Sequence, residues 1–222
     1  MFGQSQICEA VQISFGGLTL PGELTIPERN SGIVLFAHGS GSSRHSPRNK
    51  FVAGVLREHC LGTLLFDLLT PAEEEEDRLT GHLRFDIAFL AQRLLGATRW
   101  CQERERTAPI GYFGSSTGGG AALVAATQSE TPIAAIVSRG GRPDLAGDAL
   151  PNVKAPTLLL VGSKDTTVIE MNRSAAQRMK CRTELRLIPG ATHLFEEPGT
   201  LEQVSGFAAQ WFKEHFNQAP RD

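Results

Sequence analysis

Short apolar runs alternate with segments of helical periodicity along most of this 222-residue chain. Each run is nearly continuous in apolar residues, as is typical of strands that a parallel sheet buries on both faces. The runs span residues 33–37, 63–69, 109–113, 133–137, 157–161 and 184–188. This alternation predicts an α/β fold with a mostly parallel sheet and helices on both of its faces.

Three further segments have apolar residues at three- and four-residue steps, which places those residues on one stripe of a helix. The three sets are Phe51, Val52, Val55 and Leu56, then Ile87, Leu90, Ala91, Leu94 and Leu95, and last Leu201, Val204, Phe207, Trp211 and Phe212. We therefore expect a helix around each set. The acidic residues 73–77 lie between a predicted strand and a predicted helix, and such a short like-charge block predicts a solvated surface loop.

Residues 11–15 and 18–26 precede the first run and are rich in β-branched and apolar residues. Gly16-Gly17 lies between them and predicts the turn of an N-terminal antiparallel hairpin. Pro21-Gly22 is a second turn signal and predicts a break within the later segment. Because the strand and helix units occupy almost the whole chain without a linker or repeat, we expect one domain over residues 1–222, with minimal or no cap.

The charge balance and the cysteines exclude several classes of protein. Lys and Arg total 22 and Asp and Glu total 24, a formal net charge of −2 that favours neither nucleic acid nor an anionic membrane as partner. The N-terminus lacks the pattern of a secretory signal, and no stretch reaches the roughly 18 apolar residues that span a bilayer. The cysteines, Cys8, Cys60, Cys101 and Cys181, form no metal-ligand pattern and predict buried, reduced thiols in a cytoplasmic protein.

The motif Gly114-x-Ser116-x-Gly118 directly follows a predicted strand and precedes a helix start that is rich in small residues. A nucleophilic serine on a sharp strand-to-helix turn needs strained backbone angles, and glycines two positions away on either side remove side chains that would collide. Ser115 is a rival nucleophile, but it lacks glycines at both of these positions. We therefore predict Ser116 as the nucleophile.

A serine nucleophile needs a base, and the base needs a carboxylate that orients it. His193 lies in a loop after the last predicted strand, at the carboxyl edge where open α/β sheets place their sites. Asp165 follows the preceding strand and lies 28 residues before His193, which leaves room for one helix and one strand. We predict His193 as the base and Asp165 as the acid, with Asp144 and Asp148 as alternative acids.

An oxyanion hole at such a site uses one amide after the nucleophile and one amide from a loop after an earlier strand. The first donor is predicted to be the N–H of Thr117. The second is predicted to be the N–H of Ser40, in the glycine-rich loop that follows residues 33–37. His38 in the same loop is expected to brace it by hydrogen bonding and not to act as the base.

The chain resembles the α/β-hydrolase superfamily over roughly residues 30–216, in its combination of His38-Gly39-x-Gly41, the serine motif, Asp165 and Gly190-Ala191-Thr192-His193. Its small size resembles the dienelactone hydrolase branch, as a serine-nucleophile variant. It is also similar to hydrolase domains found alone or fused to phosphoribosyltransferase-like domains. Dienelactone hydrolases proper differ at two positions, because they use a cysteine as nucleophile and tend to have a glutamate where this chain has Gly39.

The resemblance implies a serine hydrolase that cleaves a carboxylic ester or lactone of a small molecule through an acyl-enzyme, without a cofactor or a metal. Two alternatives remain open, namely a catalytically silent binding module with the same fold and an acyltransferase. Nucleotide binding is disfavoured, because Gly39-x-Gly41-x-x-Arg44 lacks the third glycine of a dinucleotide fingerprint and residues 114–120 lack the lysine of a P-loop.

Three arginines lie near the expected site. Arg139 and Arg142 follow a predicted strand, and Arg44 lies in the loop on the oxyanion side. Because a guanidinium suits a carboxylate, one hypothesis is that some of them bind an anionic group of the substrate. The alternative is that they are solvated or tie loops together. The sequence indicates neither the natural substrate nor the oligomeric state.

Overall fold

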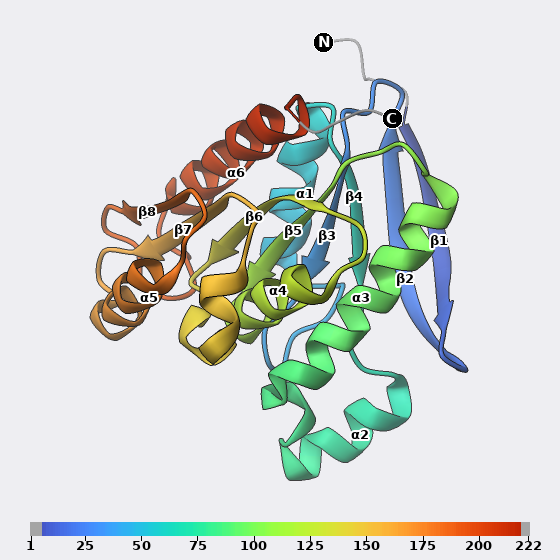
Figure 1. Ribbon diagram of the computed structural model, residues 1–222, viewed down its shortest axis with the longest axis horizontal. Helices are drawn as coiled ribbons and strands as arrows, with labels where there is room; N and C mark the ends of the chain where they lie inside the picture. Colours follow the sequence, from blue (N-terminus) through green and yellow to red (C-terminus); the bar gives the residue numbers. More distant parts are fainter. Residues whose placement is uncertain (1–5, 219–222) are drawn as a thin grey trace.

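The computed structural model describes residues 6–218 and contains an eight-stranded sheet (Figure 1). The strands are β1 (Gln6–Phe15), β2 (Leu18–Pro27), β3 (Ile33–Ala37), β4 (Gly62–Phe66), β5 (Ile110–Ser115), β6 (Ile133–Arg139), β7 (Thr157–Gly162) and β8 (Thr183–Ile188). They lie in the order β1-β2-β4-β3-β5-β6-β7-β8. Strands β3 to β8 run parallel, and the β1–β2 hairpin joins them antiparallel through β4. The predicted mostly parallel sheet with an N-terminal antiparallel hairpin is confirmed.

The hairpin turns at Gly16 and Gly17, whose φ angles of 56° and 79° lie in the left-handed region that glycine adopts readily. The predicted break at Pro21-Gly22 is wrong, because β2 continues through both residues and pairs with β1 on one side and with β4 on the other. A Cβ at Gly22 would lie only 3.1 Å from Cδ1 of Ile13. Close packing against a neighbouring strand, and not a turn, explains this glycine.

Helices cover both faces of the sheet, as predicted. They are α1 (Pro47–Glu58), α2 (Pro71–Thr80), α3 (Ile87–Arg104), α4 (Thr117–Gln128), α5 (Thr166–Arg178) and α6 (Thr200–Phe216), with two 3-10 segments, η1 (Leu83–Phe85) and η2 (Pro143–Asn152). Helices α1 and α6 pack together on one face, and α3 and α4 pack together on the other (Figure 1). The three apolar stripes in the sequence correspond to α1, α3 and α6.

Two apolar cores lie on opposite faces of the sheet, and β3 contributes to both. Leu35 points into the core under α3 and α4, whereas Val34 and Phe36 point into the core under α1 and α6. Successive side chains of a strand point to opposite faces, so a continuous apolar run supplies both cores at once. The interpretation of such runs as strands buried on both faces is confirmed for β3, all of whose residues are buried.

The acidic residues 73–77 do not form the predicted loop but lie within helix α2. Thr70 caps this helix by accepting a hydrogen bond from the N–H of Glu73, and the Glu73 carboxylate accepts one from the N–H of Thr70. Asp77 is only 1% exposed and is paired with Arg84. This reciprocal cap and a buried ion pair explain why a like-charge block is helical here.

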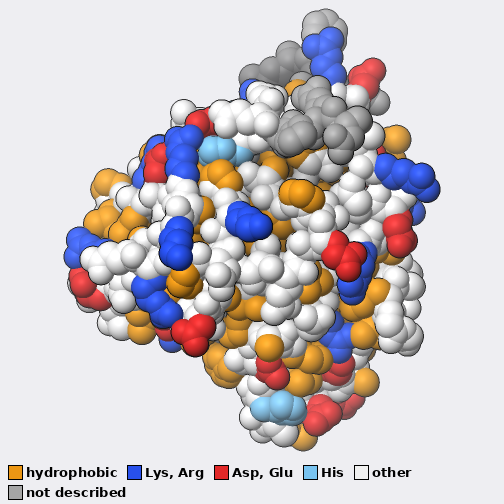
Figure 2. All heavy atoms as spheres, in the orientation of Figure 1, with side chains coloured by type: hydrophobic (Ala, Val, Ile, Leu, Met, Phe, Trp, Pro, Cys, Tyr) orange, Lys and Arg blue, Asp and Glu red, His pale blue; other side chains and the backbone are white. Residues whose placement is uncertain are grey.

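Lys and Arg side chains are interspersed with Asp and Glu on the face of the molecule in Figure 2, in keeping with the net charge of −2. Within residues 6–218, no helix is both long and apolar enough to cross a membrane. Cys101 is buried, Cys60 and Cys181 are partly buried, and Cys8 is exposed. The expectation of buried thiols is therefore wrong for Cys8, because residues 6–10 of the edge strand β1 are all exposed.

Candidate active site

Ser116 lies at the sharp turn between β5 and α4, where the sequence predicts the nucleophile. Its φ of 50° and ψ of −122° are rare for a residue with a side chain and mark a strained backbone. A Cβ on Gly114 would lie 2.6 Å from the carbonyl oxygen of Gly118, and a Cβ on Gly118 would collide with the carbonyl oxygen of Ala37. Glycine is required at both positions, because the turn packs directly on itself and on β3.

Asp165 and His193 approach each other from neighbouring loops at the carboxyl edge of the sheet. Asp165 lies between β7 and α5, and His193 follows β8. Nδ1 of His193 lies 2.6 Å from Oδ2 of Asp165. With a proton on Nδ1, this N–H donates a hydrogen bond to the carboxylate, which leaves Nε2 available to accept a proton from another group. The structure thus brings together the acid and the base that the sequence predicts.

The alternative acids are engaged elsewhere. Asp144 accepts hydrogen bonds from Nε and Nη2 of Arg142. Asp148 is fully exposed and accepts from Nη2 of Arg178. Among the described carboxylates, Asp165 is therefore the one that is hydrogen-bonded to His193.

Ser116 and His193 line the same cavity, which has a volume of about 240 Å³. Ser40, from the loop after β3, forms another part of its wall. Among the described residues, no hydrogen bond joins Oγ of Ser116 to His193, and such bonds are often long in enzymes without substrate and shorten in the complex. The cavity places the candidate nucleophile, the candidate base and one candidate oxyanion donor around a common space.

The two predicted oxyanion donors lie on segments that meet at Ser116. Thr117 is the first residue of α4, so its backbone N–H has no acceptor within the helix. Ser40 follows Gly39, where a Cβ would lie 3.1 Å from Cβ of Ser116. The loop after β3 therefore lies directly against the start of α4, as the predicted oxyanion hole requires.

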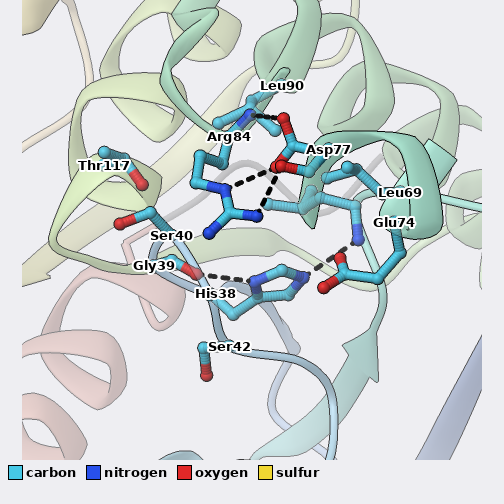
Figure 3. A pocket seen from close by; sticks show the side chains of 12 residues that line it. His38, Gly39, Ser40, Ser42, Leu69, Glu74, Asp77, Arg84, Leu90 and Thr117 are labelled. Atoms are coloured by element: carbon cyan, nitrogen blue, oxygen red, sulfur yellow. Dashed lines mark hydrogen bonds and ion pairs between the residues drawn. The ribbon is translucent and has the colours of Figure 1, made fainter. Parts of the chain in front are cut away.

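His38 braces the loop after β3 by hydrogen bonding, as predicted. Its Nδ1–H donates to the carbonyl oxygen of Gly39 at 3.0 Å, and its Nε2 accepts from the N–H of Leu68 at 3.0 Å (Figure 3). These two bonds together require a neutral imidazole, and burial lowers the pKa of His38. A protonated ring has no lone pair with which to accept the hydrogen bond from the N–H of Leu68. His38 therefore braces the loop of Ser40 in its neutral form.

The three arginines that the sequence suggests for substrate binding have different surroundings in the structure. Arg139 lines the cavity of Ser116. Arg44 is paired with Asp67 and Arg142 with Asp144, and neither arginine is among the described residues that line this cavity. Asp67 neutralises Arg44 and ties the loop after β3 to the residue that follows β4, whereas Asp144 neutralises Arg142 within a single segment.

Among the polar residues of the cavity wall, Arg48 and Asn49 were not predicted as site residues, and Ser115 was considered only as a rival nucleophile. Asn49 is 2% exposed, and its Oδ1 accepts from Oγ of Ser115 at 3.2 Å. Arg48 and Asn49 belong to the first turn of α1. The signal that could have located them is Ser46-Pro47, a capping residue followed by proline, which indicates a helix that begins just after the glycine-rich loop.

Comparison with known proteins identifies the family to which this chain belongs. A model of the dienelactone hydrolase family matches residues 73–218. The chain belongs to the dienelactone hydrolase family. The crystal structure of a dienelactone hydrolase from Anabaena variabilis ATCC 29413 is 55% identical to it, with a TM-score of 0.92, over 95% of this chain and 98% of that one. The resemblance seen in the sequence is confirmed, and the chain is an α/β-hydrolase of a family that hydrolyses ester bonds.

Other known proteins extend this comparison. Two curated proteins from Mycobacterium tuberculosis strains, whose names suggest a phosphoribosyl transferase, are each 56% identical over 209 residues of the chain. The match covers 93% of this chain but 46% of each relative, so the chain spans about half their length. Est1E from Butyrivibrio proteoclasticus is 18% identical, with a TM-score of 0.78 over 94% of this chain and 99% of that one, and it shares the fold.

Proposed function

We propose that this dienelactone hydrolase family member is a serine hydrolase that cleaves a carboxylic ester or lactone of a small molecule through an acyl-enzyme. In this proposal Ser116 is the nucleophile, His193 is the base and Asp165 orients His193. The observation that carries the proposal is the shared cavity of Ser116 and His193, with His193 hydrogen-bonded to Asp165 at 2.6 Å. The strained turn of Ser116 adds support, since backbone strain concentrates at functional sites.

The proposed reaction has two steps, and His193 transfers the proton in both of them. Nε2 of His193 takes the proton of Ser116 Oγ as this oxygen attacks the ester carbonyl carbon, and His193 then gives the proton to the departing alcohol. The N–H groups of Ser40 and Thr117 bind the developing oxyanion, and losing one such donor typically costs about 2.7–4 kcal/mol. Asp165 stabilises the protonated imidazole. Water activated by His193 next releases the acid from Ser116.

We attribute the phosphoribosyl transferase names of the mycobacterial relatives to the half of those proteins that this chain does not match. The half that it does match corresponds to this chain, in which a serine and a histidine line one cavity and an aspartate is hydrogen-bonded to the histidine. Acyl transfer, and not phosphoribosyl transfer, is the chemistry that these groups perform in other proteins.

A fluorophosphonate probe tests this assignment, because it reacts covalently with activated serine nucleophiles. We expect peptide mapping to find the label on Ser116 and the wild-type chain to hydrolyse short 4-nitrophenyl esters. Ser116→Ala should lose the label and nearly all turnover, with an unchanged urea-unfolding midpoint. Ser14→Ala is the matched control, because it removes an exposed serine hydroxyl from the hairpin, and it should retain both properties.

Three outcomes would contradict parts of the proposal. Full turnover in Ser116→Ala would overturn the assignment of the nucleophile. Labelling of Ser116 without hydrolysis of any ester would favour transfer of the acyl group to an alcohol or a thiol. The absence of both labelling and turnover in the wild type would favour a catalytically silent binding module.

A further inference from the structure

The loop that carries His193 spans residues 189–199 and connects β8 with α6. Its later part is anchored in the core by Phe195, which is 2% exposed. A Cβ on Gly140, directly after β6, would lie 3.3 Å from Cε2 of this ring. His193 is more accessible, since 41% of its side chain is exposed. A candidate base on such a loop keeps its position only if the backbone beside it is held in place.

One peptide group of this loop, between Ala191 and Thr192, is hydrogen-bonded at both of its polar ends. Its C=O accepts from the N–H of Lys164 at 2.9 Å, and Lys164 directly precedes Asp165. Its N–H donates to the Glu197 carboxylate and lies 3.1 Å from each of the two oxygens. Because a peptide group is planar, holding both ends fixes the orientation of the whole plane. This plane is therefore held from the turn of Asp165 on one side and by Glu197 on the other.

Glu197 is itself fixed at the start of α6. Its C=O accepts from the N–H and from Oγ1 of Thr200, the first residue of this helix, at 3.1 and 2.7 Å. Thr200 is 3% exposed, so this attachment lies inside the protein. Hydrogen bonds from the side chain and the N–H of Thr192 lower the pKa of Glu197, so its carboxylate is charged at neutral pH. A charged acceptor on a fixed backbone holds the N–H of Thr192 more strongly than a neutral side chain would.

We propose that Glu197 is a positioning residue of this hydrolase, which holds the peptide group before His193 so that Nδ1 of His193 stays directed at Asp165. This proposal rests on the proposed function, in which His193 is the base. A rotation of the peptide group between Ala191 and Thr192 carries the imidazole of His193 with it, because Thr192 and His193 are adjacent. Without the carboxylate, the N–H of Thr192 bonds to water, since Thr192 is exposed, and the plane is held at one end only. Misplacement of a catalytic group by about 1 Å can cost about 100-fold in rate.

Three substitutions separate the position of the Glu197 carboxylate from its charge. Glu197→Ala removes the acceptor, Glu197→Asp keeps the charge on a side chain too short to reach Thr192, and Glu197→Gln keeps an acceptor oxygen at the original length. For hydrolysis of a short 4-nitrophenyl ester, we expect Glu197→Ala and Glu197→Asp to lose about 10- to 100-fold in kcat, with KM within about 2-fold of the wild type. Glu197→Gln should keep kcat within about 5-fold of the wild type, because a neutral acceptor still bonds the same N–H, but more weakly.

Glu202→Ala is the matched control, because it removes an exposed carboxylate from the first turn of α6, and it should keep the wild-type kcat. The urea-unfolding midpoint of each variant separates misplacement of the loop from a loss of structure. If Glu197→Ala does not fold, the comparison of Glu197→Asp with Glu197→Gln still decides.

The tautomer of His193 gives a second readout that does not depend on turnover. The proton of a neutral imidazole lies on the nitrogen that the surrounding hydrogen bonds select, here Nδ1 beside Asp165. We expect the ¹⁵N chemical shifts of the His193 ring, assigned by their loss in His193→Gln, to show the Nδ1-protonated form in the wild type and in Glu197→Gln. In Glu197→Ala and Glu197→Asp, the proton should lie partly on Nε2.

The failure of this proposal can be distinguished from that of the proposed function. Unchanged kcat and an unchanged tautomer in Glu197→Ala would overturn the positioning role and leave ester hydrolysis intact. Loss of kcat in Glu197→Gln with full activity in Glu197→Asp would also overturn it, because charge and not position would then matter. If the wild type turns over no ester, the tautomer still decides. A shift of the proton towards Nε2 in Glu197→Ala would support the positioning role, and an unchanged tautomer would overturn it.

Discussion

Ser116 adopts backbone angles that cost a residue with a side chain about 1–3 kcal/mol, and its neighbours impose them. Gly114 and Gly118 allow the turn to close, and the N–H groups of Gly119 and Arg142 both donate to the carbonyl oxygen of Ser116. The strained residue is therefore held by main-chain contacts from two different elements, α4 and the segment after β6. This arrangement presents Oγ to the cavity without relying on any flexible side chain.

His38 makes the stability of the protein sensitive to acid. Burial lowers its pKa below the ordinary value of 6.5, and the charges of Asp67 and Glu74 oppose this shift only in part. As the pH falls, the unfolded chain binds a proton before the folded protein does. The contribution of His38 to the free energy of unfolding is therefore complete above pH 6.5 and is lost as the pH falls below it.

Urea unfolding of His38→Gln at several values between pH 8 and pH 5 tests this effect. The variant should lose less of its free energy of unfolding over this range than the wild type does, because glutamine does not titrate. His59→Gln, at the exposed end of α1, is the control and should follow the wild-type pH dependence. A wild-type pH dependence in His38→Gln would show that the imidazole is not the acid-sensitive group.

Helix α2 shows how local contacts decide the structure of a charged segment. It projects away from the sheet after β4 (Figure 1), so packing contributes less to it than to the central helices. Its stability depends on the Thr70–Glu73 cap and on the pair of Asp77 with Arg84. Arg84, in η1, lies beside the loop of Ser40 (Figure 3), so the pair of Asp77 with Arg84 links α2 to the loop that carries a candidate oxyanion donor.

Loss of the cap should be measurable in the whole protein. Thr70→Ala removes the acceptor for the N–H of Glu73, and we expect the free energy of unfolding to fall by about 1 kcal/mol in urea denaturation. Thr80→Ala, at the exposed other end of α2, is the control and should change stability by less than about 0.5 kcal/mol. Equal stability of the two variants would show that the cap does not stabilise α2.

At the scale of the whole molecule, the sheet separates two apolar cores. In the core under α6, a large aromatic side chain packs against a glycine of the sheet. Phe212 of α6 is completely buried and lies against Gly111 of β5, where a Cβ would be 2.7 Å from Cε1 of the ring. Phe216 packs beside it, with ring centroids 5.6 Å apart. These contacts hold α6 against β5, the strand that precedes the turn of Ser116.

Truncation of this ring tests the contribution of the α6 layer. Phe212→Ala leaves a cavity between α6 and β5, and we expect the free energy of unfolding to fall by about 3–5 kcal/mol. Phe85→Ala is the matched control, because Phe85 is 60% exposed, and it should change stability by less than about 0.5 kcal/mol. A small effect of Phe212→Ala would mean that α6 repacks to fill the space.

The fold class and the candidate triad could be read from sequence because both follow from local patterns. An apolar run and an apolar stripe identify a strand and a helix wherever they occur. Parallel strands end at one edge of a sheet, so residues that follow three such strands meet there, as Ser116, Asp165 and His193 do. The order of elements along the chain is enough to bring these side chains close together.

Which charged side chains pair with one another, in contrast, depends on contacts between segments that are distant in the sequence. Nothing local distinguishes Arg44, which is paired with Asp67, from Arg139, which is buried beside Asn49 although 90 residues separate the two in sequence. The same holds for Pro21-Gly22, which is a turn signal locally but lies in a continuous strand between two partners. Periodicity and motifs are properties of a segment, whereas burial and the pairing of charges are properties of the packed molecule.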